Sequence, residues 1–409
     1  MKILMTTQPA IGHLHPMLPV AEALKALGHE VAFASSRSFR KTIEAEGFHC
    51  FEVGLDWLES EAPATFPELL QMPPERATYW YLQELFAKRA MRAMLPDVID
   101  VARKWKPDVV VRGTWEFSGC VAAEYLELPH ASISASLYFG IWQGLIAEQL
   151  EEVRREHGLA RGEGQAMLER YLYLDFVPPS LHFPELERSP VVHSLRLGSS
   201  DRRKGDEGRG GWFEGLPEQP TVYVTLGTVF NRVPGVFEAI LAGLREEPVN
   251  VIVTVGRNQD PAAFGPQPSN VRIERYIPQE ELLPRCDVVV THGGFNTVLA
   301  ALGQGKPVVA TPLGADQPQN SLRVWRSGCG LVLPVHPGVA QLPRSEELAS
   351  CPLLSPQTLR EAVREVLGEP RYRQAAERMR LEAEALPGPE RAAELLVQLA
   401  AERKPVLSR

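Results

Sequence analysis

The chain has 409 residues, of which 44% are hydrophobic and 23% charged, and this length and composition are typical of a soluble globular protein with two domains. Its net charge of −8 argues against a nucleic-acid binder. Five scattered cysteines favour reduced thiols and a cytoplasmic location over a disulfide framework. The longest uncharged stretch, residues 131–147, is too polar and slightly too short for a membrane span. Sparse asparagine, abundant proline and more arginine than lysine indicate a bacterial source.

The N-terminal segment has the pattern of a strand, a helix and a second strand. Residues 2–7 form an apolar run that predicts a buried parallel strand. From Met17, apolar residues recur at helical spacing as far as Leu27, and Gly28 suits the C′ position that follows a helix. Residues 31–34 predict the next strand. The α/β pattern continues with apolar runs at residues 109–111 and 131–133.

A histidine follows the first strand, in the segment Gly12-His13-Leu14-His15-Pro16. The positive end of the helix from Met17 disfavours a protonated ring, so we expect His13 to be neutral at pH 7 and able to accept a proton. The alternative is a loop histidine that makes a backbone hydrogen bond. We interpret His15 as structural or acceptor-facing. Without a nearby third ligand, the two histidines do not predict a metal site.

Residues 57–86 are rich in aromatic residues and prolines and have no clean period. We interpret them as loops and short helices over an acceptor pocket, and an ordinary helical cover is an equally good interpretation. The aromatic residues suggest an aromatic or lipophilic acceptor, although core or surface packing explains many of them as well. The residues assigned to acceptor binding are Trp80, Tyr138, Phe139 and Trp142.

A polar, glycine-rich segment at residues 198–211 has the composition of a linker. A second α/β unit follows it, with apolar strands at residues 221–226 and 251–255. Near the end of the chain, residues 390–403 predict an amphipathic helix. The predicted organisation is an N-terminal domain at 1–200, a linker at 201–217, a C-terminal domain at 218–385 and a final helix at 386–409.

The most informative segment of the chain is residues 291–317, THGGFNTVLAALGQGKPVVATPLGADQ. An apolar strand turns on Gly293 and Gly294 into a helix, so the unpaired N–H groups at the helix start favour an anion. His292 and the Thr297 hydroxyl can supplement these donors. Asn296 and Thr297 could alternatively only cap the helix.

The same segment ends with a carboxylate beside a carboxamide, Asp316 and Gln317. Neighbouring hydroxyls of a sugar need such a pair, because the carboxylate accepts hydrogen bonds while the carboxamide both donates and accepts them. Asp316 could alternatively be only the N-cap of the helix that starts near Pro318. Hydrogen-bond donors for a phosphate follow one strand, and a pair of side chains suited to sugar hydroxyls follows the next strand. Together they suggest a nucleotide-sugar site.

These motifs resemble those of the inverting family 1 glycosyltransferases, the UDP/dTDP-glycosyltransferases that include plant and bacterial natural-product enzymes. Tyr276-Ile277-Pro278-Gln279 is similar to the family's Trp-x-Pro-Gln, and the segment around His13 matches its Gly-His-x-x-Pro. Both motifs occur in the expected order and at the expected separation, so the resemblance covers nearly the whole chain. It implies the GT-B fold, an α/β fold of two Rossmann-like domains with the active site in the cleft between them.

The resemblance also implies roles for individual residues. His13 becomes the general base that deprotonates the acceptor hydroxyl as this attacks the anomeric carbon. Tyr276 would stack on the nucleobase, Gln279 would sit near the ribose, and the loop at Gly227 and Thr228 would approach the diphosphate. The residues implied in donor binding are Gly12, Gly227, Thr228, Tyr276, Ile277, Gln279, His292, Gly293, Gly294, Asn296, Thr297, Asp316 and Gln317.

The chain departs from the family pattern at two positions. Many members orient the histidine with an aspartate, where the best alignment has Gly113 here. Either Glu116 orients His13, or His13 acts without a carboxylate; alternatively, Glu116 is an exposed acid near a helix start. Plant-type members carry a glutamate for the ribose hydroxyls where this chain has Ala300. Its absence favours a dTDP-sugar donor over a UDP-sugar.

The sequence therefore predicts a metal-independent hexosyltransferase that moves a sugar from a dTDP- or UDP-sugar to a hydroxyl of a small lipophilic or aromatic acceptor. No Asp-x-Asp pair is present to hold a metal, and no Gly-x-Gly-x-x-Gly or P-loop indicates a cofactor, so the nucleotide sugar is expected as a substrate and no cofactor is expected. The sequence is compatible with a homodimer. The alternatives are a nucleotide-sugar epimerase of the same fold and a non-catalytic auxiliary protein.

Overall fold

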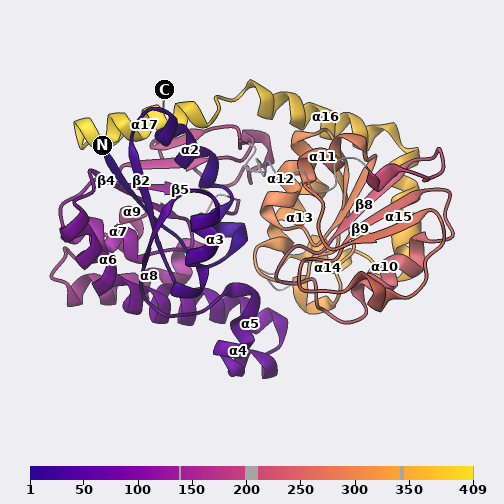
Figure 1. Ribbon diagram of the computed structural model, residues 1–409, viewed down its shortest axis with the longest axis horizontal. Coiled ribbons are helices and arrows are strands. Elements are labelled where there is room, and N and C mark those ends of the chain that lie inside the picture. The colour runs from indigo at the N-terminus through magenta and orange to yellow at the C-terminus, as the bar shows by residue number, and fades with distance from the viewer. Residues whose placement is uncertain (138–139, 199–210, 341–344, 409) are drawn as a thin grey trace. The chain divides into compact units, whose positions relative to one another are not determined.

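The computed structural model describes residues 1–137, 140–198, 211–340 and 345–408, so part of the linker predicted at 201–217 lies outside the described residues. The chain divides into two compact units. Unit 1 comprises Met1–Ser200 with Ala385–Arg409, and unit 2 comprises Asp201–Glu384. Each unit is built on a parallel β-sheet with helices packed around it, which confirms the predicted α/β class (Figure 1).

Among the described residues of unit 1, seven parallel strands form a sheet in the order β3-β2-β1-β4-β5-β6-β7. Residues 3–5 of the predicted first strand are fully buried, as expected for a parallel strand covered on both faces. The strands are β1 (Lys2–Thr6), β2 (Glu30–Ser35), β3 (His49–Glu52), β4 (Val109–Gly113), β5 (His130–Ile133), β6 (Leu172–Asp175) and β7 (Val192–Ser194).

The helix predicted from Met17 is observed as α2 (Leu18–Ala26), and Gly28 follows it with φ of +80°. The row of apolar residues predicted to be buried on this helix extends one residue too far, because Leu27 is 56% exposed. The other helices of unit 1 are α1 (Ile11–Leu14), α3 (Arg40–Ala45), α4 (Ala62–Thr65), α5 (Pro74–Trp80), α6 (Met91–Trp105), α7 (Ser118–Tyr125), α8 (Gly140–Glu156), α9 (Gly164–Met167) and α17 (Pro389–Glu402).

The aromatic segment at residues 57–86 contains short helices, as predicted, but its C-terminal part is longer than a short helix. The π-helical stretch η4 (Tyr81–Ala90) joins α5 to α6 without a break, so the chain is helical over residues 74–105. Trp57, Phe66 and Phe86 belong to the buried core of unit 1. Core packing therefore accounts for several of the aromatic residues in this segment.

The C-terminal helix α17 packs against α2, and both belong to unit 1 (Figure 1). Its buried face contains Leu395, Leu396 and Leu399. Beyond the helix, the Val406 amide donates to the Tyr171 carbonyl at 2.8 Å and the Ser408 amide donates to the Pro190 carbonyl at 2.7 Å. These contacts fasten the end of the chain to unit 1.

Among the described residues of unit 2, six parallel strands form a sheet in the order β10-β9-β8-β11-β12-β13. The neighbours β8, β11 and β12 each precede a segment predicted to bind the donor, and carboxyl ends of parallel strands meet at one edge of a sheet. The strands are β8 (Thr221–Thr225), β9 (Asn250–Thr254), β10 (Val271–Glu274), β11 (Val288–Thr291), β12 (Val308–Ala310) and β13 (Gly330–Val332). The helices are α10 (Val236–Leu244), α11 (Gln279–Leu282), α12 (Phe295–Gly303), α13 (Gln317–Arg326), α14 (Glu346–Ser350), α15 (Pro356–Gly368) and α16 (Pro370–Ala385).

Candidate active site

His13 lies in the one-turn helix α1, next to Gly12, rather than in the loop that the sequence suggested. Its ring meets the edge of the Phe86 ring, with the centroids 5.8 Å apart. Burial lowers the pKa of His13 to about 4. The ring is therefore neutral at pH 7, as predicted, but the cause is loss of hydration and not the helix end that the sequence pointed to.

Phe86 belongs to a set of aromatic rings in mutual contact. We call this set the aromatic cluster and define it as Trp57, Phe66, Trp80, Tyr81, Phe86 and Trp115. Phe86 contacts three members of the cluster as well as His13. Trp80, which was predicted to bind the acceptor, stacks edge-on against Phe66 at 5.6 Å and lies under the Arg89 guanidinium. Tyr138, Phe139 and the side chain of Trp142 lie outside the described residues.

Glu116, which the sequence suggested as a partner of His13, is buried just before Phe117, the N-cap residue of α7, and its carboxylate accepts from amides of the first turn of that helix. Its Oε1 accepts from the Ser118 amide at 2.6 Å and from the Ser118 hydroxyl, and its Oε2 accepts from the Gly119 amide at 2.9 Å and from the Thr6 hydroxyl. Both oxygens are thus occupied at the start of a helix, where a carboxylate is stabilised. The structure gives Glu116 the role of a cap in place of the predicted one, and the alternative of an exposed acid is wrong.

The carboxylate that the structure places near the base is Glu59. Its Oε1 lies 3.9 Å from His13 Nε2, and the two side chains are 19% and 13% exposed. Glu59 was missed by the sequence analysis because it follows the third strand, 46 positions from His13 along the chain, and no local motif marks it. Phe86 was also missed, because no local motif connects it with His13.

His292 lies at the carboxyl end of β11 with its ring held between two glycines. A methyl group added to Gly227 would lie 2.7 Å from the His292 ring, and one added to Gly294 would lie 2.4 Å from Nε2. Thr291 Oγ1 is 3.1 Å from Nδ1. Burial lowers the pKa of His292 to about 4, partly opposed by a hydrogen bond to the Thr225 backbone, so this ring is also neutral at pH 7.

The start of α12 is tied to α11 through two of the predicted donor residues. Gln279 Nε2 lies 3.5 Å from Thr297 Oγ1 and 3.4 Å from the buried hydroxyl of Tyr223. The structure thus brings together a residue assigned to the ribose and one assigned to the phosphate, which are 18 positions apart. Tyr223 was not predicted, since its place within an apolar strand gave no functional signal.

Asp316 and Gln317 precede and open helix α13, but their side chains do different things. Asp316 makes no side-chain cap hydrogen bond, and its Oδ2 accepts from Asn320 Nδ2 at 3.0 Å. Asp316 therefore occupies the N-cap position of α13, as the alternative interpretation had it, but its carboxylate contacts Asn320 and makes no cap hydrogen bond. Gln317 Oε1 accepts from the amides of Leu313 at 2.8 Å and Gly314 at 3.2 Å. Its oxygen thus closes the loop, which leaves its Nε2 as the group to offer a ligand.

Asn320 is a further residue of this site that the sequence analysis missed. Its Nδ2 also donates to the Gly293 carbonyl at 2.9 Å, so one side chain joins the glycine turn after β11 to Asp316. Gly293 has φ of +82°, and a methyl group there would meet Ser321 Oγ at 2.4 Å. The spacing of four residues between Asp316 and Asn320 on a helix could have indicated this contact.

The remaining predicted donor residues have varied surroundings. Tyr276 is 41% exposed, and the Arg257 guanidinium lies 4.9 Å from its ring centre. Thr228 is exposed, whereas Ile277 is buried, so the side chain of Ile277 serves the core. Asn296 follows Phe295 in the first turn of α12 and is half-buried.

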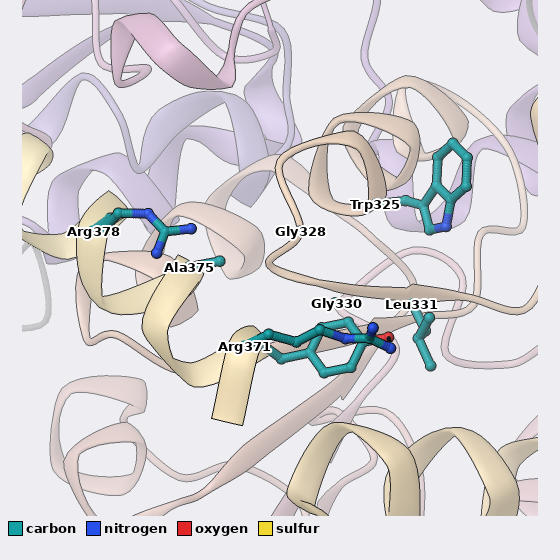
Figure 2. A pocket seen from close by; sticks show the side chains of 8 residues that line it. Trp325, Gly328, Gly330, Leu331, Arg371, Ala375 and Arg378 are labelled. Carbon is teal, nitrogen blue, oxygen red and sulfur yellow. Dashed lines mark hydrogen bonds between the residues drawn. The ribbon is translucent and has the colours of Figure 1, made fainter. Parts of the chain in front are cut away.

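A pocket of about 280 Å³ in unit 2 involves none of the predicted donor residues. Figure 2 shows it between the end of α13, strand β13 and helix α16. Its lining residues are Trp325, Gly328, Gly330, Leu331, Arg371, Tyr372, Ala375 and Arg378.

Within the described ranges, no group of three or more His, Cys, Asp or Glu side chains is arranged to hold a metal ion. In the same ranges, no helix has the length and apolar character needed to cross a membrane.

Comparisons with known proteins agree with this architecture. Residues 22–185 match the N-terminal domain of the erythromycin biosynthesis protein CIII-like family, and residues 238–399 match its C-terminal domain. The chain is 28% identical to 4'-demethylrebeccamycin synthase of Lentzea aerocolonigenes, over 93% of this chain and 94% of that protein. It is 30% identical to L-demethylnoviosyl transferase of Streptomyces niveus, over 82% of this chain and 85% of that protein.

Among solved structures, the glycosyltransferase VinC in complex with dTDP is 26% identical and covers 98% of this chain and 100% of its own, with a TM-score of 0.74. The two parallel-sheet units and this likeness define a GT-B glycosyltransferase of family 1. Within that class, the chain belongs to the erythromycin biosynthesis protein CIII-like glycosyltransferases.

Proposed function

We propose that this enzyme transfers a sugar, with inversion, from a dTDP-sugar to a hydroxyl of a small lipophilic or aromatic aglycone, with His13 as the general base. The observation that carries the donor half is the neutral His292 ring, held between Gly227 and Gly294 at the start of α12. The N–H groups at this helix start, with Thr297 beside them, suit the diphosphate. As the bond to the anomeric carbon breaks, they would take up the charge on the leaving dTDP without a metal ion or cofactor.

The acceptor half of the proposal depends on His13 and the aromatic cluster. A neutral imidazole can accept the proton of the acceptor hydroxyl while the oxygen attacks the anomeric carbon on the face opposite the diphosphate. The ring lies against Phe86 of the aromatic cluster, so one side of the base is apolar. An apolar aglycone fits such surroundings better than a sugar or a peptide does.

Thymidine is preferred over uridine in the proposal for two reasons. Ala300 replaces the glutamate that binds the ribose diol in plant-type members, so a deoxyribose loses nothing at this position. VinC, which covers nearly the whole chain, was solved with dTDP bound. The epimerase and auxiliary alternatives are not favoured, because the relatives named above are a synthase and a transferase and the His13 and His292 sites are both present.

Thermal-shift scans with dTDP, UDP, GDP and NAD test the donor class. We expect dTDP to raise Tm most and UDP less, because binding to the native state alone stabilises it, by about 2.7 kcal/mol at a hundredfold excess over Kd. The shift should be lost in His292→Ala. Protection by NAD, or by none of the four, would contradict the proposed donor.

The contact between Asp316 and Asn320 predicts how sugar binding depends on pH. Burial raises the pKa of Asp316 to about 6, while the hydrogen bond from Asn320 opposes this rise. Only the carboxylate form accepts two sugar hydroxyls, so affinity for dTDP-glucose should fall by up to about tenfold from about pH 7 to pH 5. In Asn320→Ala the pKa rises further, and the fall should begin at a higher pH.

Calorimetric titrations with dTDP-glucose and with dTDP at several pH values measure this effect. The comparison with dTDP, which lacks the transferable glucose, removes any change in the diphosphate site that follows from loss of the Asn320 bond to Gly293. If the ratio of the two affinities is the same at every pH, Asp316 does not bind the sugar as proposed.

A further inference from the structure

The position where the family carries the base-orienting aspartate is Gly113 in this chain, and Glu116 is occupied as the cap of α7. We propose that Glu59, in the short turn that follows the third strand, is the positioning residue for His13. It would orient the imidazole and stabilise the imidazolium that forms when His13 takes the acceptor proton. This inference rests on the proposed role of His13 as the base.

The geometry of the pair supports the proposal. Glu59 Oε1 faces His13 Nε2 at 3.9 Å, and both side chains are largely buried. Opposite charges at this distance interact more strongly when water is partly excluded than at an exposed surface. A distance of 3.9 Å exceeds that of a hydrogen bond, and contacts of catalytic groups are often long in a free enzyme and shorten when substrate is bound.

The backbone fixes Glu59 relative to the base. The Glu59 amide donates to the Pro9 carbonyl at 3.1 Å, and the His13 amide donates to the Ala10 carbonyl at 3.1 Å, so both residues are held by the same short segment after β1. The Ser36 hydroxyl donates to the Trp57 carbonyl at 2.8 Å, which ties the chain just before Glu59 to the end of β2. Because its backbone is fixed in this way, Glu59 can in turn fix the orientation of the His13 ring.

The energetic need for a carboxylate follows from the burial of the ring. Because burial lowers the pKa of His13 to about 4, protonation of the ring during catalysis is unfavourable. A carboxylate beside Nε2 offsets this cost. Tyr81 in η4 also lies within reach of this carboxylate, since its pKa is raised by burial and by the negative charge of Glu59.

Gly113 provides a test of whether Glu59 replaces the family's aspartate. A Cβ atom at Gly113 would lie 3.7 Å from Met17 Sδ and 3.9 Å from Thr7 Oγ1, which are ordinary contact distances. The backbone there is also free of positive φ. An aspartate can therefore be introduced at this position without a clash at its first side-chain atom.

The experiment compares the full-length protein with Glu59→Gln, Glu59→Asp and the double variant Glu59→Gln/Gly113→Asp. The matched control is Glu61→Gln, which changes an exposed acid in the same turn, η2 (Glu59–Glu61). The pKa of His13 is measured by NMR titration of its Cε1–H signal, assigned by its disappearance in His13→Ala. Transfer from dTDP-glucose is measured with benzyl alcohol and with 2-chloro-4-nitrophenol, a phenol already ionised at about pH 8.

We expect Glu59→Gln to lower the pKa of His13 and to lower kcat with benzyl alcohol about 10- to 100-fold, with little change for the ionised phenol, which needs no base. The kcat of Glu59→Asp should lie between those of the wild type and Glu59→Gln, and the kcat of Glu61→Gln should equal that of the wild type. In the double variant, Gly113→Asp should restore part of the kcat that Glu59→Gln loses. An unchanged Tm shift with dTDP shows that each variant is folded.

The proposal is overturned if Glu59→Gln leaves the pKa of His13 where it is, whatever the activity. It is also overturned if kcat falls equally with the alcohol and the phenol. Failure of the proposed function looks different, because His13→Ala would then retain transfer to benzyl alcohol while the pKa of His13 in the wild type still depended on Glu59.

Discussion

His13→Ala is expected to lower kcat for an alcohol acceptor about 10²- to 10⁴-fold, the range that general-base catalysis contributes. The reason is chemical: burial keeps His13 neutral at pH 7, and its removal leaves the acceptor hydroxyl without a proton acceptor. Transfer assays with dTDP-glucose and benzyl alcohol give kcat, and calorimetry with dTDP gives donor affinity. Donor affinity should be unchanged, since the proposed diphosphate site belongs to unit 2.

The control for this prediction is His49→Ala, which removes an exposed histidine from β3 of the same unit. It should behave as the wild type. The loss in His13→Ala should shrink when the acceptor is the ionised phenol. Equal losses with alcohol and phenol would indicate that the substitution disturbs binding or folding, and wild-type rates would remove His13 from the mechanism.

Gly294→Ala should be nearly as harmful as loss of His292 itself. The backbone at Gly294, with φ of −63° and ψ of 141°, accepts alanine, but the new methyl group would lie 2.4 Å from His292 Nε2 and must displace the ring. Loss of one positioned donor to a developing negative charge costs about 10²- to 10³-fold in kcat. Steady-state kinetics with dTDP-glucose, together with the dTDP-induced shift in Tm, measure the effect.

Two further variants identify the cause. Gly303→Ala changes a glycine at the other end of α12, where an added Cβ meets nothing within 4 Å, so it should keep full activity. In the double variant His292→Ala/Gly294→Ala the second change should add little, because the ring it displaces is already absent. If the two losses are additive, Gly294 acts through something other than His292.

Much of the fold was predictable from local pattern. The strands predicted at residues 2–7 and 221–226 are observed as β1 and β8, and their ends agree within one residue, because a parallel strand covered on both faces is mostly apolar. The glycine turn after β11 was predictable as well, since Gly293 has the positive φ that favours glycine.

The contacts between distant residues were not predictable in this way. Glu59 comes near His13 only because β3, β2 and β1 are neighbours in one sheet, an order that no motif encodes. Glu116 was suggested as the partner of His13 and Gln317 was assigned to the donor sugar, yet their carboxylate and amide oxygens accept hydrogen bonds from nearby backbone amides. Short-range backbone donors compete for such oxygens, and side-chain identity alone does not decide the outcome.

The ring of Phe86 against His13 also bears on which nucleophile reaches the sugar. Any base that can activate an alcohol can activate water, and water is present at far higher concentration than an aglycone. The face of the base that is covered by the Phe86 ring offers water no hydrogen-bond partner. Under the proposed mechanism, the burial that lowers the pKa of His13 would also limit hydrolysis of the donor sugar, which favours transfer to the aglycone over transfer to water.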